Sequence, residues 1–123
     1  MADSREYVSF PDDKGGINIS EDVIAVIAAN AVLEIDGVHS LYTAHGKELT
    51  DLVSKKSLAR GIRIGIEENE ITVDVGIMVK AGAVVNEVGR EVQDAVVTAI
   101  ESTTAVKVNS VNVSICGIAF KRP

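Results

Sequence analysis

The chain has 123 residues and a formal net charge of −6, from 18 acidic and 12 basic side chains. This balance argues against general binding to nucleic acid or to a bare anionic membrane, because both require clustered positive charge. The single cysteine cannot form an internal disulfide. We expect neither a secretory leader nor a membrane span, because residues 1–10 lack a basic region followed by an apolar one and no apolar run is long enough to cross a bilayer. We therefore expect one soluble cytoplasmic domain, which would reach a membrane only through a partner.

The first fourteen residues predict a flexible tail. Residues 1–14 are polar, contain Pro11 and show no hydrophobic periodicity. Ser20 then predicts the start of a helix, because its hydroxyl can accept a hydrogen bond from the free N–H groups of the first turn. The helix is expected to run to about Glu34 and to end at Gly37.

This first helix is apolar on two opposite sides. One side predicts an ordinary core face: Ile24, Ile27, Ala28, Ala31 and Ile35. The other side should be polar on a surface helix, yet it carries Ala25, Val26, Ala29 and Leu33. Two explanations remain open. The second side is either buried beneath the tail or the 44–60 segment, or it forms an interface with another subunit or partner.

The middle of the chain carries its only dense basic stretch. Val38–Thr43 predicts a short strand, and helical spacing of apolar residues favours a short helix within Lys47–Lys56. The basic residues are Lys55, Lys56, Arg60 and Arg63. They form either a solvated loop or helix end, where lysine suits the negative end of the helix dipole, or a contact for an anion or an RNA backbone.

Two alternating segments, Ile62–Ile66 and Ile71–Lys80, flank a polar turn and predict an antiparallel hairpin. An amphipathic helix is expected over about Asn86–Thr103. Asn86 is the predicted cap, and Gly89, which is unfavourable inside a helix, is expected to allow a close packing contact.

The final strand is predicted over Lys107–Phe120. The order helix, hairpin, helix, strand predicts an α+β fold, a two-layer sandwich with both helices on one face of a small mixed sheet. The last strand follows a helical crossover and should run parallel to a hairpin strand of the same direction. The strand order stays open. We expect one domain over residues 15–120 and a C-terminal tail at 121–123.

No combination of side chains in the sequence predicts catalysis. The only histidines, His39 and His45, have no second ligand type at metal spacing. Cys116 has no histidine at a motif spacing, and we expect a small, half-buried residue there. The sequence therefore predicts a protein that is not an enzyme and holds neither a metal nor a cofactor.

Several blocks of the sequence together resemble the bacterial alkaline shock protein family, also called the general-stress or cell-envelope stress-response family. They are the stretch around Gly16–Ala28, which follows a G-x-I-x-I-S-x-x-V-I-x-x-I-A pattern, then Glu34–Val38 (E-x-x-G-V), Gly61–Ile64, Glu87–Val88 with Val92–Gln93, and Val111–Val113 with Gly117–Phe120. Their order and spacing cover nearly the whole chain. Asn86 stands where the family commonly has proline, and a cap residue can replace that proline without altering the helix.

The resemblance implies a non-enzymatic protein of Gram-positive-type bacteria, linked to envelope stress and alkaline tolerance. Some members of the family are held near the membrane by a membrane-anchored partner, and others are linked to fatty-acid metabolism. Our first hypothesis is a protein that forms homo-oligomers or docks a protein partner through Ala25, Val26, Ala29 and Leu33. A small RNA-binding module using residues 55–63 is an alternative, although the net charge and the lack of an aromatic stacking platform disfavour it. A regulator linked to fatty-acid metabolism is another.

Overall fold

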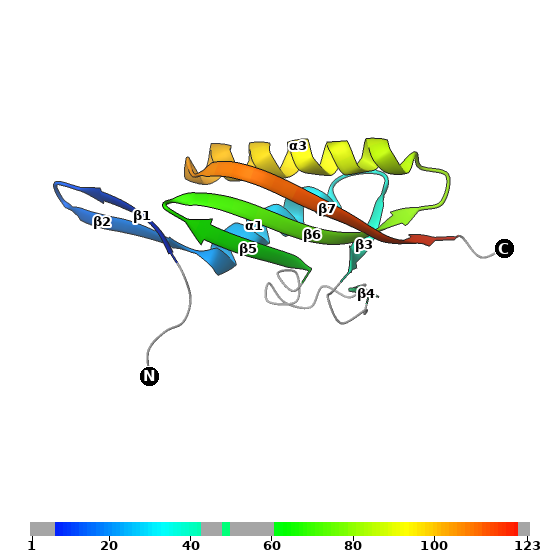
Figure 1. The fold of residues 1–123 in the computed structure, drawn as a ribbon, viewed down its shortest axis with the longest axis horizontal. Coiled ribbons are helices and arrows are strands. Elements are labelled where there is room, and N and C mark those ends of the chain that lie inside the picture. The colour runs from blue at the N-terminus through cyan, green and yellow to red at the C-terminus, as the bar shows by residue number, and fades with distance from the viewer. Residues whose placement is uncertain (1–6, 43–47, 50–60, 121–123) are drawn as a thin grey trace.

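The computed structural model describes residues 7–42, 48–49 and 61–120, with the backbone alone at residues 48 and 49. Within these ranges the chain forms two helices, α1 (Glu21–Leu33) and α3 (Val85–Thr104), and seven strands in two sheets. The strands are β1 (Tyr7–Asp12), β2 (Gly15–Ser20), β3 (Val38–Tyr42), β4 (Glu48–Leu49), β5 (Ile62–Glu67), β6 (Glu70–Lys80) and β7 (Lys107–Ala119). Figure 1 shows the α+β architecture that the sequence predicts.

The central strand is β6, which pairs with three other strands. β5 pairs antiparallel with residues 70–75 of β6 and β3 pairs antiparallel with residues 77–79, so these two strands share one edge of β6. β7 runs parallel to β6 along the opposite edge. Because α3 connects β6 to β7, the predicted parallel strand after a helical crossover is confirmed, and the structure supplies the strand order that the sequence left open.

The core lies between this sheet and the two helices. Five alternate residues of β6 are at most 2% exposed: Ile71, Val73, Val75, Ile77 and Val79. The buried residues of α3 recur at helical spacing and pack in the same cluster: Val88, Val92, Val96 and Ile100. Both periodicities are those expected of elements that bury one face, so the hydrophobic pattern alone places these residues correctly.

Helix α1 begins as the sequence predicts, because the Ser20 hydroxyl accepts a hydrogen bond from the Val23 N–H at 3.3 Å. The chain turns sharply after it, and Gly37 passes directly against the side chain of Val88 on α3. A Cβ atom at residue 37 would collide with Cγ2 of Val88. This close approach joins the end of α1 to the start of α3.

The predicted β5–β6 hairpin is confirmed, and its turn has a second role. Glu68 and Asn69 have φ values of 52° and 64°, as a two-residue hairpin turn of the favoured twist requires. The Asn69 side chain then bonds the backbone of Ser9 twice. The Ser9 N–H donates to Oδ1 at 3.3 Å, and Nδ2 donates to the Ser9 carbonyl at 3.1 Å. The turn therefore holds the middle of β1.

The prediction of a flexible tail over residues 1–14 is wrong for residues 7–12, which form β1 and pair antiparallel with β2. Val8 is fully buried and Phe10 packs against the core. The sequence did not reveal this strand because its alternation is short and its docking site, represented by Asn69, lies about sixty residues away in the chain. Residues 1–6 lie outside the described residues.

Two local predictions are also corrected. The N-cap of α3 is Val84, which makes no side-chain cap hydrogen bond, so Asn86 does not cap the helix. The short helix predicted within Lys47–Lys56 is wrong at residues 48–49, which pair with β3 as strand β4. The rest of that predicted helix lies outside the described residues.

We expect Gly37→Ala to lower the free energy of unfolding by about 1–3 kcal/mol, because the added methyl group overpacks the contact with Val88. Gly16→Ala is the matched control, since no atom lies within 4 Å of its Cβ position. Urea unfolding of both variants measures the difference. Equal stability of the two variants would contradict the close approach.

We expect Asn69→Gly to keep the turn but release β1, because glycine accepts the positive φ and lacks the amide that bonds Ser9. The loss should be about 0.5–1.5 kcal/mol per hydrogen bond. Hydrogen exchange should accelerate at Ser9 while the β5–β6 ladder stays protected. Unchanged exchange at Ser9 would show that β1 is held in some other way.

Candidate interaction surfaces

The structure divides the second apolar side of α1 between core and surface. Ala25 is 5% exposed and Ala29 is fully buried, so neither side chain can reach a partner, which corrects the proposed interface at these two positions. The reason is that α1 packs against α3 as well as β3 and β5. The buried face of the helix is therefore wide and includes Val32, which the sequence did not assign to the core.

The accessible apolar surface of α1 is smaller than the predicted interface, and it includes one residue that the sequence did not point to. Val26 and Leu33 are half-buried, and Leu33 also packs against the core. Val23 is 49% exposed and lies three residues before Val26, so the two side chains are neighbours on the helix surface. We call Val23, Val26 and Leu33 the outer face of α1. The i, i+3 spacing of the two valines was the available signal.

The basic stretch is described only at its last member. Lys55, Lys56 and Arg60 lie outside the described residues, whereas Arg63 is exposed on β5 directly opposite Asp74 of β6. A carboxylate as cross-strand neighbour offsets the charge of Arg63 and weakens its attraction for a phosphate. At its one described position, this stretch therefore gives no particular support to an RNA contact.

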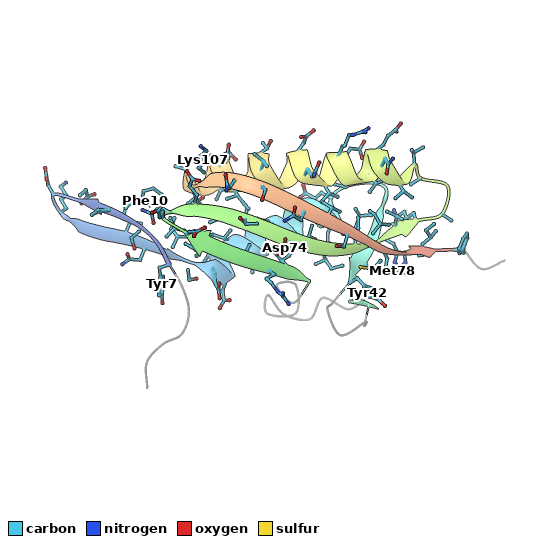
Figure 2. The ribbon with its side chains drawn as sticks, in the orientation of Figure 1. Tyr7, Phe10, Tyr42, Asp74, Met78 and Lys107 are labelled. Atoms are coloured by element: carbon cyan, nitrogen blue, oxygen red, sulfur yellow. The ribbon has the colours of Figure 1, made fainter. Side chains whose placement is uncertain are left out.

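The face of the sheet away from the helices is polar at its centre. Asn112 Nδ2 donates to Asp74 Oδ1 at 2.8 Å and so links β7 to β6 on this face. Figure 2 labels Asp74 on β6. Cys116, which we expected to be half-buried, is exposed. No group of three His, Cys, Asp or Glu side chains that could hold a metal occurs among the described residues.

One end of the sheet is more apolar. Figure 2 shows Tyr42 and Met78 near this end, and Met78 packs closely against Gly117. A shallow pocket of about 410 Å³ lies here, lined by His39, Lys80, Ala81, Ala119 and Phe120. Phe120 is 75% exposed. His45, the other histidine, is outside the described residues.

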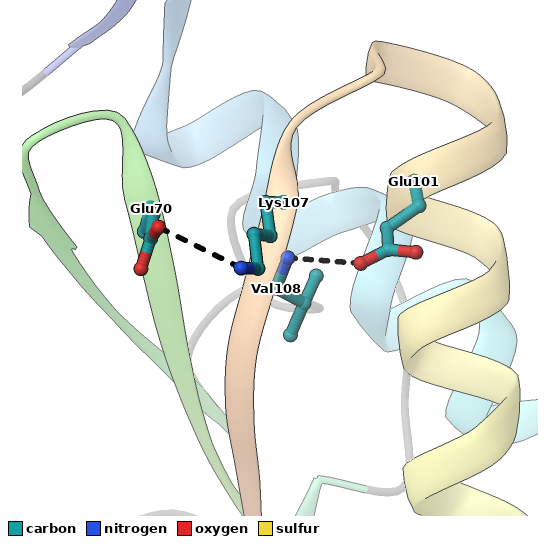
Figure 3. Close-up of polar contacts among 4 residues, drawn as sticks. All are labelled: Glu70, Glu101, Lys107 and Val108. Atoms are coloured by element: carbon teal, nitrogen blue, oxygen red, sulfur yellow. Dashed lines mark hydrogen bonds and ion pairs between the residues drawn. The ribbon is translucent and has the colours of Figure 1, made fainter.

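Side chains of α3 bond the outer edge of β7 near its start. Glu101 Oε2 accepts a hydrogen bond from the Val108 N–H at 3.1 Å (Figure 3), and Gln93 Nε2 donates to the Val111 carbonyl at 3.1 Å. Lys107 also lies 3.9 Å from Glu70 on β6, but both side chains are well exposed, so this ion pair contributes little to stability. The two bonds from α3 satisfy backbone groups that β6 does not reach.

Beyond Val111 a hollow opens between α3 and the same edge of β7. It has a volume of about 380 Å³ and is lined by Val85, Asn86, Gly89, Arg90, Gln93, Val113 and Ile115. We call it the α3–β7 groove. The close contact predicted at Gly89 is wrong, because no atom lies within 4 Å of the position where its Cβ would be. The groove was not predictable, since it combines residues of two elements whose register only the fold defines.

Comparison with known proteins now assigns the family. Residues 9–120 match the model of the alkaline shock protein 23 family, whose description is a cell envelope-related function. The chain belongs to this family, which is the one that the sequence blocks resemble. No helix of the described residues has both the length and the hydropathy needed to cross a bilayer.

Curated relatives support the assignment over most of their length. The chain is 30% identical over 111 residues to the uncharacterized protein YloU of Bacillus subtilis strain 168, covering 89% of this chain and 92% of YloU. It is 32% identical over 109 residues to the uncharacterized protein Spy1535 of Streptococcus pyogenes serotype M6, covering 88% and 82%. No solved structure gives a significant match.

We expect Gly89→Ala to raise the free energy of unfolding by about 0.5–1 kcal/mol, because alanine favours the helix and its methyl group meets only open space. Thermal and urea unfolding measure the change. A loss of stability would show that the backbone at residue 89 needs glycine for a reason inside the molecule.

Proposed function

We propose that this protein is a non-enzymatic component of the bacterial cell-envelope and alkaline stress response, which acts in the cytoplasm by binding other proteins. It self-associates and is held near the membrane by a membrane-anchored partner. The observation that carries the proposal is the match of residues 9–120 to a family with a cell envelope-related function. A protein-mediated tether suits an acidic chain, because an anionic membrane surface repels it.

The outer face of α1 supports the interaction part of the proposal. Val23 and Val26 present adjacent apolar side chains, and Leu33 continues the apolar character two turns further along the helix. Covering exposed apolar side chains on a helix surface with a partner lowers the free energy of the complex, because their apolar area leaves water. Of the four positions first proposed as an interface, only Val26 and Leu33 are retained, and Val23 replaces the two buried alanines.

We expect Val26→Asp to weaken self-association and partner binding by about tenfold or more, because the new carboxylate would have to leave water at the interface. Two measurements check this in the full chain: molar mass by light scattering, against 13.0 kDa for one chain, and the share of protein that sediments with membranes from stressed native cells.

Thr98→Asp is the matched control, since it places the same charge at an exposed position of α3. Circular dichroism verifies that both variants fold. A folded Val26→Asp protein with the mass and membrane fraction of the parent would refute the role of α1. Monomeric behaviour of the parent at all concentrations, together with its absence from the envelope fraction, would refute the proposed function itself.

A further inference from the structure

We propose that the α3–β7 groove binds an extended segment of another protein, which adds as a strand to the outer edge of β7 and presents a carboxylate to Arg90. This inference rests on the proposed function, because it names a surface on which an interaction protein would hold a partner. Strand addition at an exposed sheet edge is a general mode of peptide recognition, in which backbone hydrogen bonds supply affinity and side-chain pockets supply specificity.

The direction of the backbone groups in β7 is established by its two bonds to α3. The Val108 N–H and the Val111 carbonyl bond side chains of α3, so both groups point away from β6. Backbone groups alternate between the two edges of a strand, and therefore Val113 and Ile115 also direct theirs outward. Among the described residues, no bond to these outward groups is found beyond Val111.

The open stretch of edge is regular and bounded. The pairing of β7 with β6 shifts register twice, once at Asn109 and once at Cys116. Such bulges bend a strand and discourage pairing beside them. Between them, Ser110–Ile115 pairs without interruption, and this is a common length for a strand. The outward groups of Val113 and Ile115 lie at the end of this stretch that borders the groove.

The wall of the groove leaves space for a second backbone. Gly89 lies in the second turn of α3 and lines the groove. A Cβ atom built at this position would have no atom of the molecule outside its own helix backbone within 4 Å. Glycine disfavours the helix, and packing inside the molecule does not require it here. A bound chain passing close to residue 89 supplies the missing reason, because only glycine leaves that volume empty.

Charge decides the kind of occupant. Arg90 lines the groove, is exposed and makes neither an ion pair nor a hydrogen bond with any described residue. Val113 and Ile115 supply half-buried apolar surface. The matching segment therefore alternates apolar side chains, directed toward α3, and carries a carboxylate opposite Arg90.

A second copy of this chain fits the edge less well. Symmetric pairing of β7 with β7 would bring two α3 helices together, and four carboxylates of α3 are exposed: Glu87, Glu91, Asp94 and Glu101. Like charges facing each other across an interface disfavour that arrangement. A separate extended segment avoids this repulsion because it brings no helix of its own.

The test begins with a phage-displayed library of random 12-residue peptides, selected on the full chain. We expect enriched peptides with alternating apolar residues and one acidic residue. Hydrogen exchange should slow at Val113 and Ile115 when a synthetic peptide binds. Gly89→Leu should weaken the peptide, measured by fluorescence anisotropy, by at least tenfold, because leucine fills the groove. Glu91→Leu, the matched control at an exposed position on α3, should change affinity less than threefold.

A charge exchange gives a second readout that does not depend on filling the groove. Arg90→Glu should weaken the acidic peptide about tenfold, and replacing the acidic residue of the peptide by lysine should restore binding to that variant. The proposal is overturned if no peptide is enriched, if peptides bind Gly89→Leu as well as the parent chain, or if exchange slows only away from β7.

The two proposals can fail separately. If the parent protein neither self-associates nor fractionates with the envelope but still binds peptide at the groove, the proposed function is refuted and the groove proposal is supported. If the protein fractionates with the envelope in a way that depends on Val26 but binds no peptide at β7, the groove proposal is refuted and the proposed function is supported.

Discussion

The structure depends on the continuous burial of one face of β6. Its five inward side chains, which alternate along Ile71–Val79, contribute to the core that α1 and α3 cover, and its two edges carry β3, β5 and β7. Because the side-chain period of a strand is two, a slip of one residue would move all five apolar side chains to the polar face. This constraint sets the register of the neighbouring strands and, through the crossover, the position of α3.

The second constraint is the close packing of α1 against both α3 and the sheet. Alanines on the buried face, among them Ala25 and Ala29, let the helix approach α3 and the sheet closely, and Gly37 lets the chain leave α1 directly against Val88. A helix covered on two sides must be apolar on two sides. Most of the unusual composition of α1 is therefore explained by packing, and the surface left for a partner contracts to Val23, Val26 and part of Leu33.

The way the sheet edges are protected connects the fold to the proposed interactions. On β1, the outward groups of Ser9 bond Asn69, and Pro11, the next residue with its backbone directed outward, has no N–H to offer. On β7, side chains of α3 form hydrogen bonds to the outer edge as far as Val111, and the α3–β7 groove at Gly89 follows. An edge that is protected at its start and open over its next residues is more consistent with selective pairing than with a general liability to aggregate.

The elements whose side chains alternate or recur over long stretches, namely β5, β6, α3 and β7, were predictable from the sequence, and so were the Ser20 cap and the family. These depend on local periodicity and on hydrogen bonds within a few residues. The folded chain was needed to show that Val8 is core, that Ala25 and Ala29 face inward, and that Gly89 borders a groove. Each of these facts depends on contacts between segments far apart in the chain. A single sequence shows that a residue is apolar or small, but it does not show which distant residue that side chain contacts.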